Sequence, residues 1–232
     1  MRAALLTGLV AAPLLAGSAQ ADPGYYLITP YAMPGEAALD LRYWTVKADR
    51  RKATLWPEAG LRLGLGPRWT STLFLSGIGP ALQRQRLSSI NWAHNWVLSE
   101  GRSDWDFGLH AQAIHRPGEG NALEWGPLLQ TDQGLTRLNL NLLFERDFAT
   151  GGTQLKLQGQ ALHRFGRGLR AGLQGFGELG RWNRLSERPS LRAGPVLRLG
   201  LGDAAELQMA CLRGKTYGRT GAMFSTQLLL SL

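Results

Sequence analysis

The stretch TRLNLNLLFER, residues 136–146, alternates between apolar and polar side chains. Leucine or phenylalanine occupies positions 138, 140, 142 and 144, and most positions between them are polar: Arg137, Asn139, Asn141 and Glu145. Successive side chains of a β-strand point to opposite faces of the sheet, so the stretch predicts a strand with one apolar and one polar face. On its own it does not say whether the apolar face meets a protein core or lipid.

The same alternation recurs along most of the chain, for example over residues 105–113 and 153–165. Turn residues separate the alternating runs, whose lengths suit tilted transmembrane strands of about 9–11 residues. We expect strands over residues 36–47, 51–63, 68–78, 84–98, 103–115, 121–131, 135–147, 153–165, 168–180, 189–200, 203–213 and 222–232.

The number of strands and the lengths of their connections indicate how the strands assemble. The number is even, every second connection is short, and two of the others, residues 180–190 and 213–221, are longer and polar. This pattern predicts an all-β fold, an antiparallel transmembrane β-barrel of about 12 strands over residues 36–232. The alternative is a soluble β-sandwich, which would have the same alternation with its leucines pointing inward.

The N-terminus has the pattern of a secretory signal peptide over residues 1–21. Arg2 precedes an apolar run, and small residues end at Ala21, where we expect cleavage. An N-terminal membrane helix is the alternative, but the apolar run is shorter than the roughly 20 residues that a bilayer requires. We expect residues 22–35 to form a periplasmic N-terminal segment. The single cysteine, Cys211, excludes an internal disulfide, and we expect the chain in the bacterial outer membrane.

The composition is basic, with 26 Lys and Arg against 17 Asp and Glu, a formal net charge of +9. Such a balance can indicate nucleic acid or anionic lipid as a partner. Because the basic residues are scattered along strands and form no run, we expect no nucleic-acid partner.

Two stretches resemble a known group of proteins: ALEWGPLLQTDQGLTRLNLNLLFERDF (122–148) and GLQGFGELGRW (172–182). They resemble a largely uncharacterised proteobacterial group of Gram-negative outer-membrane β-barrels, grouped with outer-membrane transporters and the meta-pathway phenol-degradation channels. The resemblance implies a porin-like transport barrel, with outer-membrane lipid and the barrel assembly machinery as partners. It carries no catalytic signature. Such barrels usually end on an aromatic residue that the assembly machinery recognises, whereas this chain ends on Leu232.

Strand parity assigns charged side chains to the lumen of the predicted barrel. A basic wall is expected from Lys156, Arg164, Arg170, Arg192 and Arg198. An acidic side is expected from Asp106, Glu124 and Glu145. Across a water-filled lumen these walls would orient polar solutes and modestly favour small anions. Alternatively, the charges pair across a narrow interior and fill it, because barrels of about eight strands are filled by side chains.

Four aromatic residues fall at the strand ends that we expect on the periplasmic side. They are Trp69, Trp96, Trp105 and Phe165. Aromatic rings favour the headgroup level of a membrane, so these residues predict a belt at that interface.

The sequence offers little support for catalysis. There are four histidines, no metal-ligand spacing and no phosphate loop, so we expect no cofactor and no metal. His163 lies on the leucine side of its strand beside Phe165, where a lipid-cleaving barrel could place a histidine, but no serine stands at a recognisable spacing. We therefore expect a monomeric pore for small polar or anionic solutes. A closed structural or assembly barrel and a lipid hydrolase or acyltransferase are the alternatives.

Overall fold

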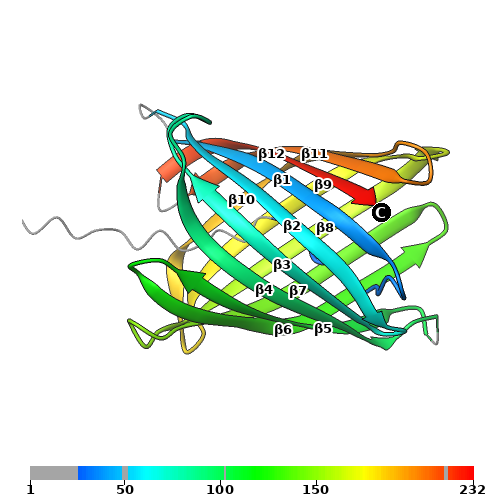
Figure 1. Ribbon diagram of the computed structural model, residues 1–232, viewed down its shortest axis with the longest axis horizontal. Helices are drawn as coiled ribbons and strands as arrows, with labels where there is room; N and C mark the ends of the chain where they lie inside the picture. Colours follow the sequence, from blue (N-terminus) through cyan, green and yellow to red (C-terminus); the bar gives the residue numbers. More distant parts are fainter. Residues whose placement is uncertain (1–25, 49–51, 102, 217–218) are drawn as a thin grey trace, which may run out of the picture.

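The structure is a computed structural model that describes residues 26–48, 52–101, 103–216 and 219–232. Within these residues, twelve β-strands form one closed antiparallel barrel (Figure 1). No described helix is long and apolar enough to cross a membrane. The strands are β1 (Ala37–Ala48), β2 (Thr54–Gly66), β3 (Trp69–Ile78), β4 (Arg86–Ser99), β5 (Asp106–Arg116), β6 (Gly120–Gln133), β7 (Thr136–Asp147), β8 (Thr153–Gly166), β9 (Leu169–Arg181), β10 (Arg184–Gly200), β11 (Ala205–Thr216) and β12 (Arg219–Ser231).

The apolar face of the sheet is the outer face of the barrel. In β7, Leu140 is 44% exposed, whereas Asn141 on the other face is 0% exposed. Leu73 on β3 and Leu173 on β9 are likewise exposed. A β-sandwich would bury these leucines, so the sandwich alternative is excluded and the predicted transmembrane barrel is confirmed.

Pairing between the first and last strands closes the sheet. The β1–β12 register runs from Ala38 opposite Ser231 to Ala48 opposite Gly221. At the end of the chain, the backbone N–H of Leu232 donates to the carbonyl of Ala37 at 2.9 Å. We call the barrel end that holds Leu232 the C-terminal rim, and the opposite end the distal rim. The connections after even-numbered strands lie at the C-terminal rim.

Two connections at the distal rim are shorter than the sequence suggested. The expected loop 180–190 is mostly strand, because β9 ends at Arg181 and β10 begins at Arg184, with an irregular register between Leu185 and Ser190. The expected loop 213–221 is also shorter, since β11 continues to Thr216 and β12 begins at Arg219. Backbone pairing with a neighbouring strand satisfies the N–H and C=O groups whatever the polarity of the side chains. These strands therefore extend beyond the residues in which apolar and polar side chains alternate.

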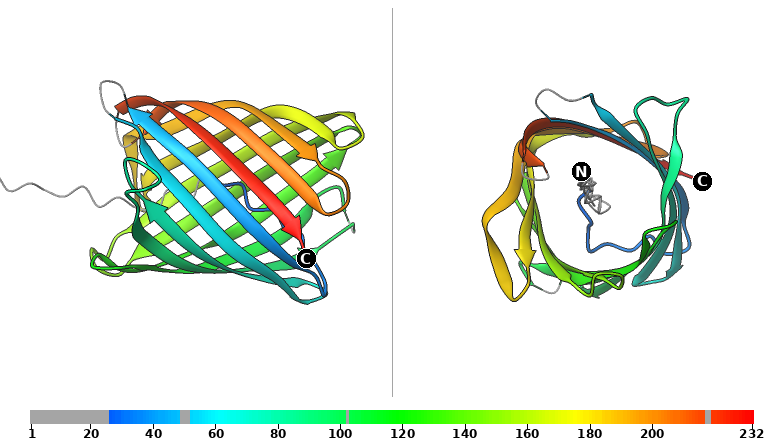
Figure 2. Two further views of the ribbon diagram at one scale, coloured as in Figure 1. Left: turned by 45° about the horizontal axis from the view of Figure 1, so that its top comes forward. Right: turned by 90° about the vertical axis from the view of Figure 1, so that its left-hand side faces the viewer.

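The N-terminal segment, defined here as residues 26–34, lies inside the barrel. The expected signal peptide 1–21 and residues 22–25 lie outside the described residues. Residues 26–34, expected as part of a periplasmic segment, lie in the lumen of the barrel (Figure 2). Asn141 Nδ2 donates to the carbonyl of Ile28 at 2.8 Å, and the N–H of Met33 donates to Thr70 Oγ1 at 3.3 Å. The lumen therefore supplies the hydrogen-bond partners that a peptide without a neighbouring strand needs.

Several lumen-facing glycines allow the strands to approach closely beside a large buried side chain. A Cβ on Gly126 would lie 1.9 Å from the carbonyl oxygen of Leu142, and one on Gly172 would lie 1.8 Å from that of Ala161. The neighbouring inward side chains, Leu143 and Leu162, are both 0% exposed. Glycine thus creates the space that these leucines fill.

We predict that Gly126→Val destabilises the barrel by about 1–3 kcal/mol or prevents its assembly, because the new side chain meets backbone that cannot rotate away. The measurement is the urea unfolding midpoint, with the mobility of the folded barrel on a gel as a check of assembly. Gly159→Ala is the matched control, since the nearest atom to its new Cβ lies 3.9 Å away. Equal midpoints for both variants would contradict the close-approach account.

Candidate functional site

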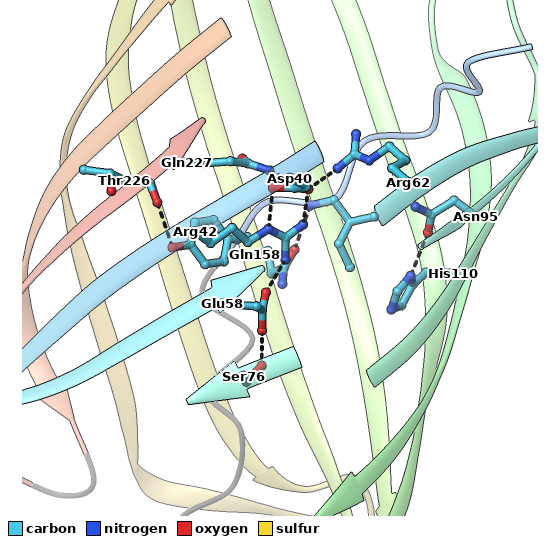
Figure 3. Close-up of polar contacts among 12 residues, drawn as sticks. Asp40, Arg42, Glu58, Arg62, Ser76, Asn95, His110, Gln158, Thr226 and Gln227 are labelled. Atoms are coloured by element: carbon cyan, nitrogen blue, oxygen red, sulfur yellow. Dashed lines mark hydrogen bonds and ion pairs between the residues drawn. The ribbon is translucent and has the colours of Figure 1, made fainter. Parts of the chain in front are cut away.

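The wall of β1–β3 carries an ion cluster, which we call the β1–β3 cluster. It consists of Asp40 and Arg42 on β1 and Glu58 and Arg62 on β2, and Ser76 on β3 donates to Glu58. Arg42 lies between two carboxylates, 2.9 Å from Asp40 and 3.0 Å from Glu58 (Figure 3). Arg62 reaches Asp40 at 2.5 Å, and Gln227 Nε2 donates to the same carboxylate. Asp40 is fully buried, so its charge is satisfied entirely by protein groups.

The β1–β3 cluster also contacts the N-terminal segment. The Arg42 guanidinium lies 4.6 Å from the ring centroid of Tyr26 and 4.1 Å from the ring centroid of Phe74. Tyr26 packs edge-on against Trp44 at 5.1 Å. Guanidinium–ring and ring–ring contacts of this kind hold the beginning of the segment against one wall.

A second ion cluster lies on β5–β8; this β5–β8 cluster consists of Arg116, Glu124, Glu145 and Lys156. Lys156 Nζ donates to Glu124 at 2.8 Å and also to Glu145. Arg116 lies 2.7 Å from Glu145, and His110 Nε2 lies 3.5 Å from Glu124. The two carboxylates therefore face two permanent cations, and the cluster neutralises itself.

Side-chain amides line the lumen between the two clusters. Gln160 donates to Gln174, and Asn141 Nδ2 donates to Gln158 Oε1 at 2.9 Å. Gln158 Oε1 also accepts a hydrogen bond of 3.4 Å from the N–H of Ile28. Amides both donate and accept, so this lining can bind either a peptide or water.

Tyr31 fixes the segment near the C-terminal rim. Its hydroxyl donates to Asp106 Oδ2 at 2.9 Å, and Gln130 donates to the same hydroxyl. Burial and the bond to Asp106 raise the pKa of Tyr31 to about 12, so the phenol stays protonated and remains a donor.

A set of arginines gathers at the C-terminal rim; we call Arg137, Arg164, Arg170 and Arg198 the rim arginines. Arg170 stands directly opposite Arg164 on one side and Arg198 on the other. Arg137 forms a two-bond pair with Asp132 at 2.7 and 2.9 Å. Like charges directly opposite each other on a sheet repel, so this arrangement favours binding of an anion.

The rim arginines border a cavity of about 410 Å³. Its described lining contains five arginines, the four rim arginines and Arg167, and one carboxylate, Glu206. Glu206 lies 2.7 Å from Arg198, and Asp132 lies 3.7 Å from Arg170. These two carboxylates are fewer than the five arginines, so the mouth of the barrel has an excess of positive charge.

The structure divides the predicted basic wall. Arg164, Arg170 and Arg198 are together at the C-terminal rim, whereas Lys156 belongs to the β5–β8 cluster and Arg192 lies 3.2 Å from Glu178. Glu124 and Glu145, expected to face Lys156 across the lumen, are its ion-pair partners, and Asp106 accepts from Tyr31. The alternation along a strand predicts which face of the sheet a residue is on, but not its position along the barrel axis. Arg116 was missed because the expected strand ended at residue 115, although its parity matches that of His110.

The predicted aromatic residues all lie near the C-terminal rim. Trp69 begins β3 and stacks on Trp96 with ring centroids 6.3 Å apart. Trp105 directly precedes β5, and Phe165, 66% exposed, is next to the last residue of β8. That this rim is the periplasmic one stays a prediction.

The space left in the lumen is small. A lumen cavity beside the N-terminal segment measures about 110 Å³ and is lined by Tyr26, Ile28 and Tyr31 together with both walls. Pockets that hold drug-sized ligands measure about 300–1,000 Å³. With the N-terminal segment in place, the barrel has room only for water or small ions at this level.

Two outward-facing histidines, His163 and His94, lie near hydroxyl side chains. His163 Nδ1 lies 3.0 Å from Thr136 Oγ1. Ser71 stands opposite His94, but the serine hydroxyl accepts from Trp92 Nε1 at 3.0 Å and His94 Nδ1 accepts from Trp69 Nε1 at 3.2 Å. Thr136 lies within the reach of a nucleophile and its base from His163, but no hydrogen bond from a further described residue orients the His163 ring, and Ser71 and His94 are each held by an indole instead of by one another. Within the described residues, no group of His, Cys, Asp and Glu could hold a metal ion.

Three solved structures with the same fold are described as porins or outer-membrane channels. The NanC porin matches with a TM-score of 0.63 and 10% identity over 84% of this chain and 100% of that chain. The COG4313 outer membrane channel from Pseudomonas putida F1 matches with a TM-score of 0.60 and 10% identity over 88% of this chain and 98% of that chain. The KdgM porin in complex with disordered oligogalacturonate matches with a TM-score of 0.60 and 8% identity over 84% and 99%.

No family model and no curated protein sequence matches the chain. At 8–10% identity the structural likenesses show the fold alone. That fold is the one predicted from the sequence: a transmembrane β-barrel of the outer-membrane type, with the architecture of porin-like channels.

We predict that Lys156→Met destabilises the barrel by about 3–5 kcal/mol, because it leaves Glu124 without its cation and Glu145 with Arg116 alone in a buried site. Urea unfolding followed by tryptophan fluorescence measures the change. Adding Glu124→Gln should recover part of the loss, since the unpaired charge is removed with its partner. A double variant as unstable as the sum of the two single variants would contradict a coupled cluster.

Proposed function

We propose that the protein is an outer-membrane channel for small polar solutes that favours anions at its C-terminal rim and is restricted by its own N-terminal segment. The observation that carries this proposal is the group of four rim arginines, in which Arg170 stands opposite both Arg164 and Arg198 and which has only two nearby carboxylates, Asp132 and Glu206. A positive mouth raises the local concentration of anions and lowers that of cations.

The composition of the walls supports a lumen that can hydrate. Lys156 pairs with Glu124 and Glu145, and Arg42 pairs with Asp40 and Glu58, so both ion clusters are neutralised by wall residues. The N-terminal segment contributes no counterion to either cluster within the described residues. Its departure would therefore leave the wall charges paired and expose amides that water can satisfy.

The side chains at the mouth of the barrel indicate the class of solute. The excess of guanidinium groups at the rim suits carboxylates and phosphates, which arginine binds with two parallel hydrogen bonds. The KdgM porin, solved with disordered oligogalacturonate, is one barrel of this fold with an acidic saccharide. For this chain we propose smaller anions, because the free cavity in its lumen is only about 110 Å³.

A closed barrel is the second candidate, and the small lumen cavity is the observation that favours it. In a closed barrel the N-terminal segment would be a permanent part of the interior, like the side chains that fill smaller barrels. Ion conductance across planar bilayers separates the two candidates.

We predict that Arg164→Glu combined with Arg170→Glu shifts the reversal potential in a salt gradient from the anion side to the cation side. Arg146→Glu, the same substitution at a single exposed residue on the outer face of β7, is the control and should leave the potential unchanged. The preference should weaken in 1 M salt, where the Debye length is about 3 Å, compared with about 10 Å at 0.1 M.

An unchanged reversal potential in the rim variant would contradict anion selection by the rim arginines. No conductance from wild type or variant would contradict the channel and favour the closed barrel.

A further inference from the structure

We propose that the outer face of β8–β11 binds a membrane lipid with an anionic phosphate headgroup, with an acyl chain in a groove and the phosphate at a pair of cations. The site is separate from the lumen and does not depend on the proposed channel activity. It is formed by an apolar hollow, a group of cations at one end of that hollow, and an indole ring at the other.

The groove is a hollow of about 760 Å³ on the lipid-facing side of the sheet. Its floor consists of small residues that are cross-strand partners: Gly159 on β8 is opposite Gly175 on β9, and Gly175 is opposite Ala193 on β10. The space above Gly159 is open, since a Cβ there would have no neighbour closer than 3.9 Å.

Leucines form the two sides of the groove. Leu157 and Leu191 lie two residues from the floor on one side, and Leu173 lies on the other. Leu173 is 64% exposed and Leu191 is 51% exposed, so they project beyond the glycine floor. An apolar groove of this shape suits a flexible hydrocarbon chain. Lipid acyl chains are also the surroundings of the outer face of a transmembrane barrel.

Two cations stand at the distal-rim end of the groove. Arg213 on β11 is opposite Ala193, and the same cross-strand row continues through Ala222 to Lys47 on β1. Neighbouring strands are about 4.8 Å apart, so Arg213 and Lys47 are separated by about 10 Å, with only the methyl group of Ala222 between them. Both side chains are exposed, and no described carboxylate forms an ion pair with either.

The position of these cations suits a headgroup. Arg213 lies close to the end of β11, so its long side chain can reach the interface while its methylene groups remain in the apolar layer. A charge on the lipid-facing side is least costly near that interface. Arginine and lysine together bind a phosphate strongly, so a phosphate headgroup is a suitable partner for the two exposed cations.

The groove ends at Trp105, near the C-terminal rim. From Arg213 on β11 to Leu140 on β7, the cross-strand rows span four strand spacings, which is about 19 Å. One leaflet contributes about half of the roughly 30 Å hydrocarbon core, or about 15 Å. The groove can therefore accommodate one acyl chain over its length, with the cations at one interface and the indole toward the other.

The test is native mass spectrometry of the delipidated, folded barrel with phosphatidylglycerol added. The reference ligands are diacylglycerol with the same acyl chains, which lacks the phosphate, and inorganic phosphate, which lacks the chains. We expect at least tenfold tighter retention of phosphatidylglycerol than of either reference ligand. Equal retention of diacylglycerol would overturn the cation site, and equal retention of inorganic phosphate would overturn the groove.

Four variants locate the site. Arg213→Gln with Lys47→Gln should lower the affinity for phosphatidylglycerol at least tenfold, and Arg146→Gln, an exposed cation of the same face away from the groove, should not. Gly159→Leu fills the groove and should lower the affinity similarly, and Ala113→Leu on the outer face of β5 should not. The mobility of the folded barrel shows that each variant has assembled. Wild-type affinity in both the cation variant and the groove variant would overturn the proposal.

Discussion

The absence of water in a lipid bilayer is the constraint on which the rest of this structure depends. Each backbone N–H and C=O in the hydrocarbon layer must find a partner within the protein, and a closed sheet provides one for every strand. The pairing of β1 with β12 completes that closure. Once the sheet is closed, strand alternation has only one consistent reading, with leucines outward and polar residues inward.

Closure concentrates polar and charged groups in an interior that must satisfy them. The β1–β3 and β5–β8 clusters do so within the walls, through pairs such as Arg42 with Asp40 and Lys156 with Glu124. The amides between them form hydrogen bonds both to one another and to the N-terminal segment, for example from Asn141 to Gln158 and to Ile28. The segment is thus held by groups that water could satisfy equally, whereas the ion clusters are held by charges that it could not easily replace. In the proposed channel, this difference makes the segment, and not the wall, the part of the interior that solutes can displace.

The sequence predicted the barrel and the faces of its strands because alternation reports side-chain direction residue by residue. Leu140 and Asn141 lie on the predicted sides, and most strand ends fall within three residues of their expected positions. The alternation weakens near residues 184–190, and there the strand was mistaken for a loop, since backbone pairing does not require a pattern in the side chains. The segment at residues 26–34 has no alternation, and the Pro34-Gly35 turn at its end does not say where the segment lies, so nothing local to it indicated that it enters the lumen.

The candidate site was predictable only where a tight turn fixes the register. The turn between β8 and β9 places Arg164 opposite Arg170, so that part of the rim arginines follows from the sequence. Lys156 and its partners come from three strands, and their heights depend on the registers of two hairpins, which parity alone does not give.

Single-channel conductance of wild type and of a variant lacking residues 26–32, in the same planar bilayers, tests the central claim most directly. The claim is that the barrel stays folded without the N-terminal segment and that the segment limits the passage of ions. It predicts a folded variant with a conductance several times that of wild type and the same preference for anions. A folded variant with wild-type conductance would contradict it.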